Sequence, residues 1–209
     1  MPRPRSDIEP RIVHAARRRF LENGVDGASL RRIARDAHTN IGMVYYYFPT
    51  KDDLFLAVVE EIYEKLLEDI GAELERQGSF GERVRAMYRR VGAMSEDELA
   101  VFRLVAREAL VSSARLERLV ERFKRGHIPL ILRALTDGIS AGEVDPSYHP
   151  AVALLTTLAI GVVPQIVLHI AGDRLPFPDR PRGDALAAQL TSLLVRGLGT
   201  PSAETKAES

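Results

Sequence analysis

Residues 29–51, SLRRIARDAHTNIGMVYYYFPTK, contain two short segments that a polar break separates. Apolar residues at positions 30, 33, 34 and 37 have the spacing of one face of an α-helix. The segment HTN at 38–40 interrupts that period, and Asn40 can cap a second helix that begins near Ile41 and stops before Pro49. This pattern predicts two short helices joined by a tight turn, with the rest of the chain as their support.

The second half of this stretch carries a family resemblance. Gly42, a hydrophobic residue, Tyr45 and two further aromatic residues, then Phe48 and PTK, resemble the N-terminal helix-turn-helix of the TetR family of bacterial transcriptional regulators. The resemblance extends back through residues 12–24 and forward through residues 54–58. The rest of the chain resembles the family only in the number, lengths and order of its expected helices.

Two positions depart from the family pattern. The family commonly has glycine and an aliphatic residue in the turn, where this chain has His38 and Thr39, so the turn forms only if His38 tolerates a positive φ. Ile41 stands where the family often has Lys, Pro or Arg. An apolar side chain there suits a thymine methyl group rather than a phosphate or a guanine.

The charge of the chain is unevenly distributed. Residues 1–51 carry 10 Lys and Arg against 5 Asp and Glu, whereas residues 52–209 carry 19 against 24. A basic head attracts phosphate and a mildly acidic body is repelled by it. Most of the run Arg17–Arg19 is interpreted as solvated surface. Cysteine is absent and residues 1–10 lack the apolar core of a secretory signal, so a cytoplasmic location is expected.

Capping signatures place the next helices. Thr50 and Asp53 have the spacing of N-cap and N3 for a connecting helix that runs to about Ile70. Two Ser-x-x-Glu boxes open helices over about 83–94 and 96–111: Ser79 with Glu82, and Ser95 with Glu98. A long apolar period over 115–140 predicts one helix with a kink at Pro129.

Residues 151–171 contain no formally charged side chain and could span a bilayer by length. Central polar residues and Pro164 argue against that, and the same pattern results when one side of a helix packs on its own domain and the other on a second subunit. A leucine-lined last helix follows a loop at 172–183. The two helices are expected to pair across a twofold axis, without a membrane, through Leu155, Leu158, Val162, Gln165, Ile166, Leu186, Leu190, Leu193 and Leu194.

The expected fold class is all-α. A three-helix DNA-binding domain occupies residues 1–51, a helical effector-binding and dimerisation domain occupies 52–200, and 201–209 form a polar tail expected to be disordered. The resemblance implies that Arg31 and residues 41–43 face base edges, while Tyr45, Tyr46 and Lys51 hold phosphates. The full predicted DNA-binding set is Ser29, Arg31, Arg32, Asn40, Ile41, Gly42, Met43, Tyr45, Tyr46, Tyr47 and Lys51.

The resemblance also implies an effector pocket in the second domain. Its candidate residues are Met87, Tyr88, Met94, Phe102, Val105, Phe123 and His127, which as apolar and aromatic side chains suit a small hydrophobic or amphipathic molecule. The five histidines have no metal-ligand spacing, so neither metal nor cofactor is expected.

Residues 138–142 match the G-x-S-x-G motif of α/β-hydrolases, which requires a strand before the serine. A helical pattern precedes Ser140 here, so a helix C-terminus is expected and an enzyme is not. The predicted function is a homodimeric regulator, a repressor released from a palindromic operator by its effector. The alternatives are an activator or ligand-independent regulator of the same fold, an α-helical enzyme, and a membrane-anchored interaction protein.

Overall fold

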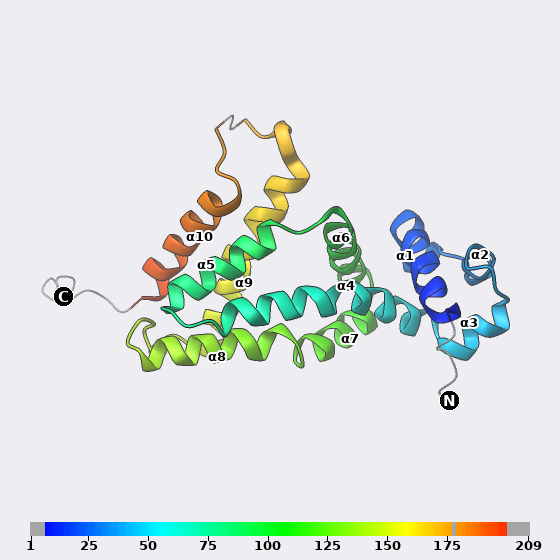
Figure 1. Cartoon of the computed structure of the whole chain (residues 1–209), viewed down its shortest axis with the longest axis horizontal. Helices are drawn as coiled ribbons and strands as arrows, with labels where there is room; N and C mark the ends of the chain where they lie inside the picture. Colours follow the sequence, from blue (N-terminus) through cyan, green and yellow to red (C-terminus); the bar gives the residue numbers. More distant parts are fainter. Residues whose placement is uncertain (1–6, 177–178, 200–209) are drawn as a thin grey trace, which may run out of the picture. The chain divides into compact units, whose positions relative to one another are not determined.

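The structure, a computed structural model, describes residues 7–176 and 179–199. Within those ranges the chain forms ten α-helices, one short 3-10 helix and an isolated bridge between Val144 and Gly199 (Figure 1). The predicted all-α class is confirmed. The predicted disorder of residues 201–209 falls outside the described residues.

The helices group into two compact units. Unit 1 extends to Leu66 and includes residues 95–122, and unit 2 comprises residues 67–94 and those from Phe123 onward. Unit 1 contains α1 (Ile8–Gly27), α2 (Leu30–Asp36), α3 (Ile41–Tyr47), the first part of α4 (Lys51–Leu74), α6 (Glu96–Val111) and most of α7 (Ser113–Phe123). Unit 2 contains the end of α4, α5 (Phe80–Gly92), α8 (His127–Ser140), α9 (Pro150–Ala171), η1 (Gly172–Arg174) and α10 (Gly183–Leu198). By packing, α6 and most of α7 therefore belong with the N-terminal helices, a grouping that differs from the predicted boundary at residue 51.

The core of unit 1 forms around two aromatic rings. Phe20 of α1 and Phe55 of α4 are fully buried and meet edge to face, with ring centroids 6.5 Å apart. Val44 of α3 and Ile33 of α2 are buried as well, so each short helix contributes its apolar face to the same core. Burial of these faces, more than helix propensity, holds seven-residue helices in place.

The arginine run of α1 is structural, which corrects its interpretation as solvated surface. Arg19 and Arg18 lie 2.6 and 3.1 Å from the carboxylate of Asp36 on α2. Arg17 lies 3.5 Å from Asp97 on α6. The hydrogen bond from Arg19 is the main reason that the pKa of Asp36 is lowered. These three arginines therefore form ion pairs that link α1 to α2 and α6, and their charges are not left unpaired for binding a phosphate.

Two helix starts in unit 1 are capped differently. The Thr50 hydroxyl accepts from the amide of Asp53 at 3.1 Å and the Asp53 carboxylate accepts from the amide of Thr50 at 3.0 Å, which confirms the box that opens α4. Ser29 occupies the N-cap position of α2 with an extended backbone, but its side chain makes no capping hydrogen bond.

Both Ser-x-x-Glu boxes form as predicted, with reciprocal bonds at Ser79 and Ser95. The first box opens α5 at Phe80 rather than near residue 83.

The prediction of one kinked helix over 115–140 is wrong. Helix α7 ends at Phe123, residues 124–126 form a turn, and α8 starts at His127. Pro129 is the third residue of α8. A backbone N–H at that position has no intrahelical acceptor, so proline removes no helical hydrogen bond there. The apolar period continued through the turn because both helices bury one face.

Helix α9 packs against α5 in unit 2. The Tyr88 hydroxyl donates to the carbonyl of Thr157 at 2.7 Å, and the Gln165 amide donates to the carbonyl of Tyr88 at 2.9 Å. By length and composition α9 could cross a membrane, with mean hydropathy 2.2, a test that core helices of soluble proteins also pass. Only 22% of that apolar window is buried inside the chain, so most of it is available to another partner.

Candidate nucleic-acid interface

A tight turn joins α2 to α3 without glycine. His38 has φ 51°, the one positive φ at a non-glycine residue in the described ranges. The amide of Thr39 donates to the carbonyl of Ala34 at 2.9 Å, and the Asn40 side chain accepts from the amide of Met43 at 3.0 Å. The turn therefore forms with His38 in the left-handed region, as its sequence required, and Asn40 caps α3 as predicted.

Helix α3 directs aromatic hydroxyls outward. Val44 and Phe48 are buried, whereas Tyr45 and Tyr46 are 53% and 76% exposed. Tyr47 is half-buried and its ring meets that of Tyr46 edge to face at 5.2 Å. Exposed tyrosine hydroxyls on a helix that follows a tight turn are suitable donors to phosphate oxygens.

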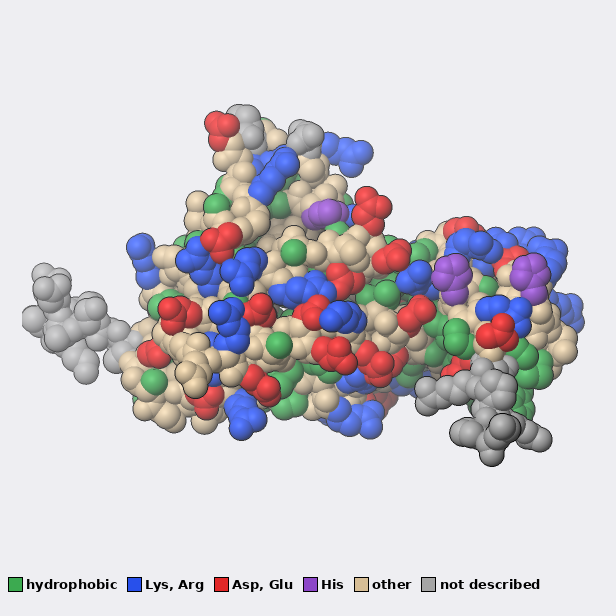
Figure 2. Space-filling view, in the orientation of Figure 1, with side chains coloured by type: hydrophobic (Ala, Val, Ile, Leu, Met, Phe, Trp, Pro, Cys, Tyr) green, Lys and Arg blue, Asp and Glu red, His purple; other side chains and the backbone are tan. Residues whose placement is uncertain are grey.

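Helix α2 carries three arginines whose charge is not neutralised within the described part of unit 1. Arg31, Arg32 and Arg35 are exposed, and none has a side-chain partner among the described residues, in contrast to the paired arginines of α1. In Figure 2, Lys and Arg side chains gather over the α1–α2 end of unit 1 on the face drawn. Unpaired arginines beside a recognition helix can neutralise phosphates and release counterions.

The N-terminal half of α3 presents uncharged surface. Ile41 and Met43 are half-exposed and Gly42 is exposed. A Cβ added at Gly42 would lie 3.1 Å from the Asn40 side-chain oxygen, so glycine here protects the cap as well as allowing close approach to a groove.

Lys51 is half-buried at the start of α4, and its ammonium donates to the carbonyl of Asp26 at 3.0 Å. Besides its predicted phosphate contact, this lysine therefore links the start of α4 to the last turn of α1.

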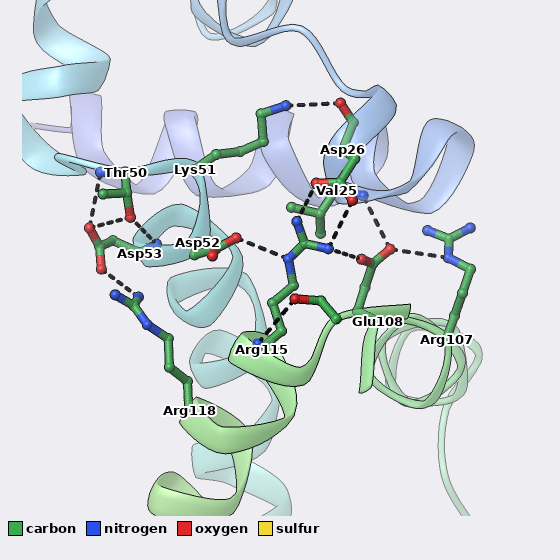
Figure 3. Close-up of polar contacts among 11 residues, drawn as sticks. Val25, Asp26, Thr50, Lys51, Asp52, Asp53, Arg107, Glu108, Arg115 and Arg118 are labelled. Atoms are coloured by element: carbon green, nitrogen blue, oxygen red, sulfur yellow. Dashed lines mark hydrogen bonds and ion pairs between the residues drawn. The ribbon is translucent and has the colours of Figure 1, made fainter. Parts of the chain in front are cut away.

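A cluster of charged side chains around Arg115 was not predicted from the sequence. The guanidinium of Arg115 on α7 contacts three carboxylates, those of Asp26, Asp52 and Glu108 (Figure 3). The hydrogen bond from Arg115 to Asp26 is the main cause of the lowered pKa of Asp26, and it is also the main cause of the raised pKa of Arg115. Asp26 and Asp52 are 89 and 63 residues from Arg115 in sequence, so no local spacing signals the cluster.

The predicted effector residues are divided between the units. Phe102 and Val105 belong to unit 1, and the others to unit 2. Tyr88 is fully buried with its hydroxyl bonded, and burial raises its pKa. The rings of Phe123 and His127 lie 4.9 Å apart. Two open clefts of about 350 Å³ in unit 2 are lined around Arg83 and contain none of the seven predicted residues, so the effector site stays a prediction.

The predicted dimer residues also separate. Gln165, Leu190 and Leu194 are buried inside their own chain, against neighbouring helices of unit 2, and so cannot form an outward face. Leu155 and Leu193 are 64% and 63% exposed. The remaining four, Leu158, Val162, Ile166 and Leu186, are half-buried. The outward apolar stripe of α9 consists of the predicted Leu155 together with Val152, Val163, Val167 and Ile170, which the prediction did not include.

Ser140 lies in the last turn of α8, where its hydroxyl donates to the carbonyl of Thr136 at 3.0 Å. A helix precedes it and Gly142 follows with φ 74°, which confirms the helix C-terminus. No group of three or more potential metal ligands occurs within the part of the chain that the structure describes.

A capped seven-residue helix after a tight turn, exposed tyrosines and unpaired arginines together define a helix-turn-helix DNA-binding unit. Comparison with known proteins agrees, because a family model described as bacterial regulatory proteins, tetR family, matches residues 12–58. The fatty acid metabolism regulator protein of Bacillus subtilis (strain 168) is 21% identical over 133 residues, 64% of this chain and 69% of that protein. The HTH-type transcriptional regulator UidR of Escherichia coli (strain K12) is 25% identical over 161 residues, 75% of this chain and 80% of that protein.

Solved structures of such regulators share this fold over most of the chain. The crystal structure of FadR from Bacillus subtilis in complex with stearoyl-CoA aligns with a TM-score of 0.73 at 20% identity, covering 90% of this chain and 98% of that one. Residues 12–58 of the present chain therefore form a DNA-binding domain of the tetR type, and the chain is a DNA-binding transcriptional regulator.

Proposed function

We propose that the protein is a homodimeric, ligand-responsive repressor that acts in the cytoplasm. Paired α2–α3 units bind successive major grooves of a palindromic operator, because a twofold dimer matches a twofold-symmetric site. The observation that carries this proposal is the capped α3 with Tyr45 and Tyr46 exposed beside the unpaired arginines of α2.

A small hydrophobic or amphipathic effector releases the operator by stabilising a conformation that binds DNA less well. Release requires only a difference in effector affinity between the two conformations. The stearoyl-CoA bound by the FadR relative supports an effector with an acyl chain. The seven predicted effector residues remain the candidates for this site.

The test is selection of DNA from a random library by purified protein, followed by binding to the enriched sequence at two salt concentrations. A palindrome whose affinity falls steeply with salt is expected, with Arg32→Ala and Tyr46→Ala weakening binding by roughly tenfold each. Arg103→Ala is the matched control, since Arg103 is an exposed arginine of α6 in the same unit outside the α2–α3 pair. Absence of enrichment with folded, dimeric protein would overturn the proposal.

A further inference from the structure

Helix α1 is interrupted at Gly24, and two side chains of α6 bond to its backbone on either side of this residue. Gly24 has φ 74°, which takes it out of the helix. The freed amide of Val25 donates to the Glu108 carboxylate at 3.2 Å, and the carbonyl of Phe20 accepts from Arg107 at 2.9 Å. The positive φ favours glycine at this position, and a Cβ there would also lie 3.3 Å from the Arg107 guanidinium. Neighbouring residues of α6 thus bond to one backbone donor and one backbone acceptor on the two sides of the break.

Arg115 joins this contact to the start of α4. It donates to Glu108 at 2.7 Å and to Asp52 at 2.9 Å, and it forms a two-pronged contact with Asp26 (Figure 3). Its side chain is 7% exposed and that of Glu108 is 4% exposed. A planar guanidinium with five N–H donors can hold three carboxylates in fixed directions, which a lysine cannot.

The segment held by these contacts lies directly before α2. Val25 and Asp26 lie in the last turn of α1, which ends at Gly27, and α2 begins at Leu30. Asp52 lies in the first turn of α4, directly after α3 and its exit through Phe48. Glu108 of α6 and Arg115 of α7 therefore contact the chain just before α2 and just after α3.

We infer that Glu108 and Arg115 are positioning residues for DNA recognition: they set the pose of the α2–α3 pair by fixing the chain that enters it and the chain that leaves it. This inference rests on the proposed operator binding. A displaced pair loses base contacts and register, which specific affinity requires. Nonspecific affinity depends on phosphate charge and tolerates displacement.

The test measures operator and nonspecific DNA affinity separately for Arg115→Met, Arg115→Lys and Glu108→Gln, at a temperature where circular dichroism shows each variant folded. Operator affinity is expected to fall about tenfold or more for Arg115→Met, with nonspecific affinity within about twofold of the wild type. Arg115→Lys keeps the positive charge but lacks the planar guanidinium, so its operator affinity should lie between those of Arg115→Met and the wild type. Glu108→Gln keeps an acceptor for Val25 and should lose less than Arg115→Met.

Arg118→Met is the matched control. Arg118 lies one turn further along α7 and pairs at 2.8 Å with Asp53 of α4, but both partners are half-exposed, and neither contacts residues 25 and 26. Its operator affinity should stay within about twofold.

Three outcomes separate the possibilities. Wild-type protein that selects no operator overturns the proposed function and this inference with it. Wild-type binding with unchanged operator affinity in Arg115→Met and Glu108→Gln overturns the inference alone. Equal loss of operator and nonspecific binding also overturns it, since that result indicates a smaller folded fraction. If Arg115→Met fails to fold, the ratio of operator affinity to nonspecific affinity in Arg115→Lys and Glu108→Gln decides between these outcomes.

Discussion

Gly161 of α9 leaves the space that the ring of Tyr88 fills. A Cβ at position 161 would overlap three ring atoms of Tyr88. The ring cannot withdraw, because Tyr88 is fully buried and its hydroxyl is bonded to the carbonyl of Thr157. The packing of α5 on α9 therefore depends on a glycine in the middle of an otherwise apolar helix.

Gly161→Ala is expected to destabilise the protein. Alanine improves helix propensity by about 1 kcal/mol, but overpacking a closed core costs about 1–3 kcal/mol and forces two helices apart. Urea unfolding should show the net loss. Gly197→Ala in α10 is the control, because a Cβ there meets nothing within 4 Å, and it should be neutral or stabilising. A Gly161→Ala protein as stable as the wild type would contradict the tight fit.

Sequence reasoning succeeded where the cause of a structure lies within a few residues. The Asn40 cap, the Thr50–Asp53 box and the left-handed His38 all depend on neighbours in the chain. It failed where a partner is chosen by the tertiary fold. Arg19 and Arg115 look alike as surface cations, and only their distant carboxylates show that they are structural.

Helical period also left the facing of α9 and α10 unresolved. When a helix is apolar nearly all round, its sequence does not show which side faces a second subunit. Gln165 and Leu194, which are predicted to lie in the dimer interface, are each buried in their own chain. Their direction depends on where α5 lies, which no local pattern contains.

Acid should weaken the link between α1 and α2. Arg19 lowers the pKa of Asp36 below its usual 3.8, so the folded state binds this proton less readily than the unfolded state. The resulting stability is fully present above the unfolded pKa and is lost as pH falls through the folded pKa. Denaturant unfolding between pH 7 and pH 3 should therefore show a shallower acid decline in Asp36→Asn than in the wild type. Arg19→Gln removes the main cause and should flatten the decline similarly, and a wild-type slope in that variant would refute the assignment.

Thymine methyl groups should contribute to operator affinity. Ile41 and Met43 are the half-exposed, uncharged side chains beside Gly42, and a methyl group in the major groove is the apolar feature they can contact. Replacing thymine by uracil at one contacted position removes one methyl group, worth about 0.8 kcal/mol, or roughly fourfold in affinity. Ile41→Ala should abolish the difference at one position and Met43→Ala at another. Uracil outside the half-sites is the control, and equal affinity of all uracil-substituted half-sites would contradict apolar readout.

A charge on the outward stripe of α9 should separate the proposed dimer. Leu155 and Val163 are 64% and 57% exposed in the chain, and a second copy packed on this stripe would bury them both. Leu155→Glu then places an unpaired carboxylate in an apolar interface, at a cost of about 3 kcal/mol, or roughly a hundredfold in the dimer dissociation constant. Analytical ultracentrifugation should show a monomer that binds an operator half-site weakly. Leu110→Glu is the control, since Leu110 is 90% exposed on α6 outside the stripe and should stay dimeric. A dimeric Leu155→Glu protein would place the interface elsewhere and leave α9 exposed to some other apolar partner.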